Sequence, residues 1–112
     1  MQIVLIILKD ESLLEKIASI FIECELFDTS ILDGEGVETI ASETSEIFNE
    51  IKRFFGNTMN YNRVIISAVP NQQSVEQLVK LIKEENINFN DGNTGVFVSF
   101  PCTFFIGGGN NK

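Results

Sequence analysis

Three short stretches of this chain are apolar at consecutive positions, and this pattern constrains the fold more than any other feature. They are Ile3-Val4-Leu5-Ile6-Ile7-Leu8, Val64-Ile65-Ile66 and Val96-Phe97-Val98. A strand with this pattern is apolar on both faces and is typical of a buried sheet. The predicted strands are 2–8, 63–69 and 96–100, with a continuation at 103–106, and a weaker one at 29–33 that ends at Gly34-Glu35-Gly36.

Helical spacing of apolar residues separates these strands. The first stripe is Leu13, Leu14, Ile17, Ala18 and Phe21, which follows Asp10 or Ser12 as a possible N-cap. The second is Val75, Leu78, Val79 and Ile82, which follows Asn71. A third stripe predicts a short helix at 45–55.

This order of elements predicts an α+β protein with the ferredoxin-like βαββαβ sandwich. Its sheet is antiparallel, both main helices lie on one face, and the short extra helix lies in the loop after the second strand. Two helices cover one face of the sheet, so much of the other apolar face is left open. Soluble monomers rarely expose such a surface. We therefore expect a homo-oligomer that buries these sheet faces.

Composition narrows the possible functions. The 112 residues fit one domain, 1–112, with a flexible tail at 107–112. There are 8 basic and 16 acidic residues, a net charge of −8, and no His. The acidic balance argues against nucleic acid as a partner. Without His, neither Cys24 nor Cys102 has the usual general base, and no catalytic or metal-ligating residue is predicted.

Hydropathy and the N-terminal pattern indicate where such a chain functions. Its most apolar stretch, 96–106, is shorter than the ~20 residues that span a bilayer. The N-terminal apolar run is short and lacks the preceding basic residues of a signal peptide. We expect no membrane insertion and a cytoplasmic location.

Over about residues 2–106 the chain resembles the PII signalling family and its PII-like relatives. The resemblance rests on the order of elements, on Thr29 before a strand that ends at Gly34-Glu35-Gly36, and on the segment 91–101, which reads DGNTGVFVSFP. This last segment is similar to the glycine-rich loop that precedes the family's final strand. These motifs are weak one by one and moderately specific in this order.

The resemblance implies a homotrimer that binds a small effector, such as an adenine nucleotide, in clefts between subunits and signals to a protein target. The implied ligand-binding residues are Thr29, Gly34, Glu35, Gly36, Gly92, Asn93, Thr94 and Gly95. The implied partner-docking segment contains Glu46, Phe48, Glu50 and Phe54.

This sequence departs from the family at the cations that hold nucleotide phosphates. Gly95 stands where nucleotide-binding members have a Lys, and Phe104-Phe105-Ile106 stands where they have two Arg. Phosphate recognition relies on such charge-assisted donors. The ligand is therefore left open between a nucleotide and another small effector.

Other interpretations of the same residues also stand. The two glycine segments could be an ordinary bulge and an ordinary turn, which would give a structural or interaction protein with this fold and no effector. A trimer similar to the divalent-cation-binding CutA family is a third alternative, although the chain lacks His.

Overall fold

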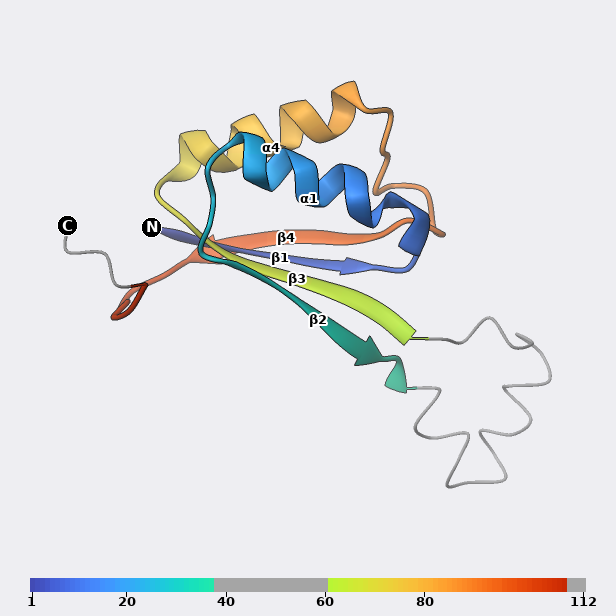
Figure 1. Ribbon diagram of the computed structural model, residues 1–112, viewed down its shortest axis with the longest axis horizontal. Coiled ribbons are helices and arrows are strands. Elements are labelled where there is room, and N and C mark those ends of the chain that lie inside the picture. Colours follow the sequence, from blue (N-terminus) through green and yellow to red (C-terminus); the bar gives the residue numbers. More distant parts are fainter. Residues whose placement is uncertain (38–60, 109–112) are drawn as a thin grey trace.

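Four strands form one antiparallel sheet, and two helices cover one of its faces (Figure 1). The computed structural model describes residues 1–37 and 61–108. In chain order the elements are β1 (Gln2–Leu8), the 3₁₀ turn η1 (Glu11–Leu13), α1 (Leu14–Glu23), β2 (Thr29–Glu35), β3 (Tyr61–Val69), α4 (Gln72–Glu84) and β4 (Gly95–Pro101). The expected α+β class is confirmed.

The strands are arranged in the order β2-β3-β1-β4, with β2 and β4 at the edges. At the centre of the sheet, Ile6 pairs with Ile65 on one side and with Phe97 on the other. This arrangement is compatible with a ferredoxin-like fold. The predicted helix at 45–55 lies outside the described residues.

Several predicted boundaries need correction. Gly34 and Glu35 do not end β2 as a turn; they belong to the strand and pair with Asn62 and Tyr61. β3 accordingly begins at Tyr61, two residues before the predicted start. The expected continuation of β4 at 103–106 is also wrong, because these residues form no strand.

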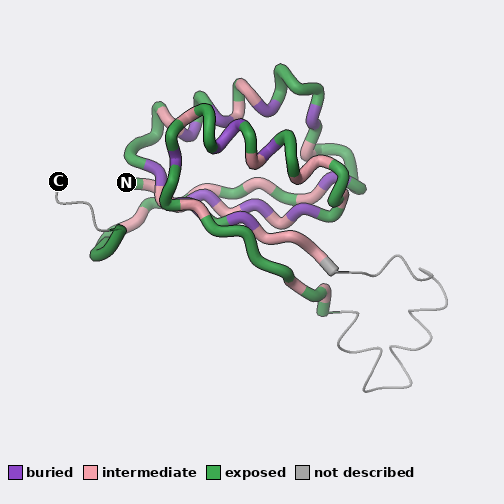
Figure 2. Tube along the Cα trace, in the orientation of Figure 1, coloured by how far each residue is buried: buried purple, intermediate pink, exposed green. Residues whose placement is uncertain are grey.

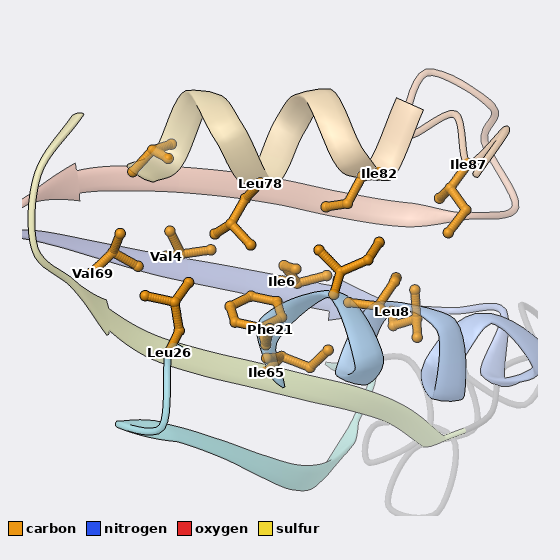
Figure 3. Packing of buried hydrophobic residues seen from close by; sticks show 13 residues of the cluster. Val4, Ile6, Leu8, Phe21, Leu26, Ile65, Val69, Leu78, Ile82 and Ile87 are labelled. Carbon is orange, nitrogen blue, oxygen red and sulfur yellow. The ribbon is translucent and has the colours of Figure 1, made fainter. Parts of the chain in front are cut away.

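The core lies between the sheet and the two helices (Figure 3). Val4, Ile6 and Leu8 point from β1 toward the helices and are almost completely buried. Ile17 and Leu78 meet them from α1 and α4, and both are fully buried. Each such side chain contributes about 1.5–3 kcal/mol through burial. The alternation along β1 thus assigns its even-numbered residues to the core.

The opposite face of the sheet, called the outer face below, is apolar and is not covered by any described residue. Its paired positions on β1, β3, β4 and β2 are Ile3, Leu5, Ile7, Asn62, Val64, Ile66, Ala68, Val96, Val98, Phe100, Ser30, Leu32 and Gly34. Exposed hydrophobic side chains among them include Leu32, Ile66, Val96, Val98 and Phe100. Ser30 and Asn62 are the polar residues in this set, and none carries a charge. The described part of the chain therefore leaves the sheet open, as its sequence predicts.

Asn71 is the N-cap of α4, as predicted, and its removal should cost measurable stability. Its Oδ1 accepts hydrogen bonds from the Ser74 backbone N–H at 2.9 Å and from the Ser74 hydroxyl at 3.1 Å. We expect Asn71→Ala to lower the free energy of unfolding by about 1 kcal/mol, measured by urea denaturation. Asn71→Asp keeps the acceptor and adds a negative charge at the helix N-terminus, so it should preserve stability. Equal losses in both variants would contradict the capping role.

Candidate functional site

A hollow of about 450 Å³ lies at the end of the sheet where β2 stops and β3 begins. It is lined by Glu11, Asp33, Gly34, Glu35 and Arg63. This volume is in the range of small-molecule sites, about 300–1,000 Å³. A second hollow, between α4 and the start of β4, holds only about 160 Å³ beside the Phe89 and Phe97 rings. The larger hollow is therefore the better candidate for a ligand site.

Arg63 connects three elements at the larger hollow. Its Nε donates to Glu11 Oε1 at 2.8 Å, and its Nη2 lies 2.8 Å from the same oxygen. Its Nη1 lies 3.0 Å from Asp33 Oδ1. Asp33 is the cross-strand partner of Arg63, whereas Glu11 reaches it from η1. The guanidinium thus joins β3 to β2 and to the start of the first helix.

The charges of the hollow favour neutral or cationic groups over polyphosphate. Among the described residues that line the hollow there are three carboxylates, those of Glu11, Asp33 and Glu35, and one guanidinium. Two of these carboxylates already engage Arg63. The Arg63 side chain is 36% exposed and its partners more so, and ion pairs of this kind contribute less than about 1 kcal/mol each. A ligand could therefore replace these ion pairs at a small cost in free energy. An anionic ligand would still be repelled by the carboxylates.

The structure brings two of the predicted ligand-binding residues to this hollow. Gly34 and Glu35 line it directly, and Gly36 follows them immediately after β2. Gly34 allows a close approach of the neighbouring strand, since a Cβ there would lie 3.1 Å from Val64 Cγ2. This first glycine segment is therefore a tightly paired strand end beside the hollow.

The second predicted segment forms a turn whose polar groups bond within the chain. Asp91 accepts the Asn93 N–H on its side chain at 3.0 Å and the Thr94 N–H on its backbone carbonyl at 3.0 Å. Thr94 is buried, and its carbonyl accepts the Lys9 N–H at 2.9 Å. The amides of Asn93 and Thr94 are thus already committed and do not form a ready anion cradle, whereas Gly92 is exposed with free space around its Cα.

Gly95 is fixed by the sheet itself. Its φ is +138°, and a Cβ there would overlap the Ile7 carbonyl oxygen. A side chain at this position would collide with β1, so only glycine fits. This geometry gives Gly95 a structural reason to be glycine that does not depend on any ligand.

The two segments lie at the same end of the sheet but on opposite edges. Gly34 is near the end of β2, and Gly95 is at the start of β4, with β3 and β1 between them. Neighbouring strands are about 4.8 Å apart, so roughly 14 Å separates the two edges. Within one chain, these segments do not share a pocket.

Thr29 lies away from both segments. It begins β2, five residues before Gly34, which corresponds to about 17 Å along an extended strand. Its hydroxyl donates to the Leu26 carbonyl and lies 2.7 Å from the Ser67 hydroxyl, which is buried. The structure thus uses Thr29 to fasten β2 to β3 at the far end of the sheet.

Sequence reasoning missed Arg63 and Glu11. Arg63 looks like the polar start of an apolar strand, and Glu11 looks like a first-turn helix residue. Their meeting depends on the β2–β3 register, which places Arg63 opposite Asp33, and on η1. The one signal that could have indicated Arg63 is a charged residue at the start of an otherwise apolar strand.

The cysteines offer no reactive pair in the described part of the chain. Cys24 and Cys102 are both free and half-buried. Burial raises the pKa of the Cys24 thiol, and the nearby Glu23 carboxylate raises it further. Cys24 is therefore protonated at neutral pH and a poor nucleophile. Within residues 1–37 and 61–108, no cluster of three or more His, Cys, Asp or Glu residues could hold a metal ion.

The predicted docking residues Glu46, Phe48, Glu50 and Phe54 lie outside the described residues.

Among the helices that the structure does describe, none is long and apolar enough to cross a membrane. No protein-family model matches the sequence, and no curated protein is significantly similar to it.

Proposed function

We propose that this chain is a PII-like regulatory protein with a ferredoxin-like fold. It forms a cytoplasmic homotrimer, binds a small effector in clefts between subunits, and signals to a protein target through the segment 39–60. The order of elements and the open outer face support this proposal. Both would be expected of a domain whose sheet packs against other copies.

The observation that carries the proposal is the position of the two glycine segments. Gly34-Glu35 and Gly92–Gly95 lie at one end of the sheet on opposite edges. In a head-to-tail ring, two different patches of neighbouring copies meet, and in the proposed trimer these patches are the two sheet edges. Such a ring would bring the Gly34 edge of one copy to the Gly95 edge of its neighbour. An effector site between subunits would then contain both predicted segments.

The residues of the hollow bear on which effector fits. Among the described residues that line it, Arg63 is the only cation, and it is paired with Glu11 and Asp33. We therefore favour a small effector with little negative charge over an adenine nucleotide, which remains the alternative ligand. The alternative function is a structural or interaction protein with no effector, which the internally bonded turn at 91–95 favours.

A thermal-shift screen with ATP, ADP, 2-oxoglutarate, bicarbonate and Mg²⁺ tests this function. A probe present at 100 times its dissociation constant should stabilise the protein by about 2.7 kcal/mol and raise its melting temperature. Glu35→Lys changes the charge inside the hollow and should change the dissociation constant of that probe by at least about tenfold, or 1.4 kcal/mol.

The matched control is Glu76→Lys, which makes the same charge change at an exposed position on α4. It should leave the response to the probe unchanged. If Glu35→Lys also leaves the response unchanged, the hollow is not the effector site. If no probe shifts the melting temperature of the wild type, the protein without an effector is the better description.

A further inference from the structure

An uncharged, apolar arm follows β4 and consists of residues 102–108. Its Phe104 and Ile106 side chains are among the most exposed hydrophobic groups of the described chain, at 78% and 83%, and Phe105 is 42% exposed. Residues 95–111 contain no charged residue, although the chain as a whole carries −8. Contact of these apolar side chains with water is unfavourable. An exposed group of this kind usually marks a site that another surface covers.

The structure bonds the start of the arm to the sheet. The Cys102 N–H donates to the Met1 carbonyl at 3.0 Å, which ties the start of the arm to β1. Gly108 lies against the Asp28 side chain, since a Cβ there would be 3.1 Å from Asp28 Oδ1. Gly107 and Gly108 both have positive φ values. The arm is therefore bonded to β1 at its start and passes close to Asp28 at Gly108.

The arm extends the outer face of the sheet. It continues from β4 past the end of the sheet, away from the two helices (Figure 1), and Figure 2 shows it as exposed after its first residue, Cys102. Phe100, the last outer-face residue of β4, is itself exposed. The outer face and the arm are thus consecutive along the chain, and neither contains a charged side chain, although Asp28 lies beside Gly108.

Electrostatics identifies the occupant of this surface. Nucleic acids and anionic membranes are repelled by a net charge of −8, and the arm offers no Lys or Arg to attract them. A charged surface placed on this patch would bury charges without partners, which is costly, whereas an uncharged apolar surface would not. The outer face of a second copy is uncharged and apolar, so it matches the arm in chemistry.

We propose that the arm is a self-association element: Phe104 and Ile106 of one copy pack on the outer face of a neighbouring copy. This inference rests on the homo-oligomer of the proposed function and adds the segment that links its subunits. The arm starts at the end of the sheet, where the Cys102 N–H is bonded to the Met1 carbonyl, and it continues past that end (Figure 1).

Analytical ultracentrifugation of the full chain tests the role of the arm. Phe104→Ser combined with Ile106→Ser should raise the dissociation constant of the oligomer by at least about tenfold. Single replacement by Ile106→Ser should have a smaller effect in the same direction. The matched control is Ile22→Ser, which removes a 63% exposed Ile from α1 and should leave the dissociation constant unchanged. Far-UV circular dichroism should show that all variants are folded, since none of these side chains belongs to the core.

Photo-crosslinking locates the contact directly. The photoreactive residue p-benzoylphenylalanine at position 104, in a mixture of ¹⁴N- and ¹⁵N-labelled protein, should crosslink to peptides of β1, β3 or β4 from a different copy. Crosslinks only within one copy, or only to α1 and α4 of another copy, would overturn the inference.

The same measurements separate the arm from the proposed function. An unchanged oligomer in the double variant overturns the role of the arm but leaves the homo-oligomer intact. The role of the arm is also overturned if Ile22→Ser weakens association as much as the double variant does. A wild-type chain that is monomeric at tens of micromolar overturns both.

Discussion

Gly95→Ala is expected to lower the free energy of unfolding by about 3–5 kcal/mol, or to prevent folding altogether. Two costs combine at this position. The backbone has φ +138°, which L-residues rarely adopt, and the added Cβ would overlap the Ile7 carbonyl oxygen. Gly95 pairs with Leu8, so relief of the overlap would separate β4 from β1 at the start of their ladder. Urea denaturation followed by circular dichroism measures the loss.

Two other glycines provide matched controls for this substitution. A Cβ at Gly92 would have no neighbour within 4 Å, and Gly92→Ala should change stability by less than about 0.5 kcal/mol. Gly34→Ala should have an intermediate effect because the Val64 side chain must shift. With no ligand present, the loss of stability should decrease in the order Gly95→Ala, Gly34→Ala, Gly92→Ala. Equal stability of Gly95→Ala and Gly92→Ala would show that the strand contact does not require glycine.

The elements that were predicted well are those whose local signals agree with the tertiary structure. β1 matches its predicted range because a continuous apolar run is compatible with burial at alternate positions and partial burial between them. α4 begins after Asn71 and buries Val75, Leu78 and Ile82, because capping and periodicity indicate the same start and the same face. For these two elements, the local sequence is sufficient to predict the bounds of β1 and both the start and the buried face of α4.

The end of β2 was misread because a local signal competed with pairing between distant segments. Glycine permits a turn at Gly34 and Gly36, but Gly34 also allows β3 to approach closely through Val64. The pairing of Glu35 with Tyr61 depends on residues that are far apart in sequence. Sequence pattern alone does not contain the register that decides between these outcomes.

The candidate site could be predicted only in part, for the same reason. The resemblance to the PII family implied Gly34 and Glu35, and both line the hollow. Arg63 and Glu11 join them through the sheet register and a 3₁₀ turn, and neither leaves a local pattern. Conversely, Thr29 resembled a ligand-binding residue, yet its hydroxyl bonds to Leu26 and Ser67 inside the protein.

Val98→Glu is expected to dissociate the oligomer and raise its dissociation constant by at least about 100-fold, or about 2.7 kcal/mol. In a single chain the Val98 side chain is 40% exposed, so a carboxylate there stays hydrated, and the strand loses at most about 1 kcal/mol. Between packed outer faces the same carboxylate would be buried without a partner, which costs several kcal/mol. Sedimentation equilibrium over a range of concentrations measures the change.

Two controls attribute this effect to burial of a charge on the outer face. Val98→Thr keeps the shape of the side chain without the charge, so it should weaken association far less than Val98→Glu. Ile22→Glu adds the same charge at an exposed position on α1 and should leave association intact. Because acidic copies repel one another, raising the salt concentration should strengthen association of the wild type by screening that repulsion. A Val98→Glu variant that sediments like the wild-type oligomer would mean that the outer face stays in contact with water, and its apolar surface would then need a partner other than this chain.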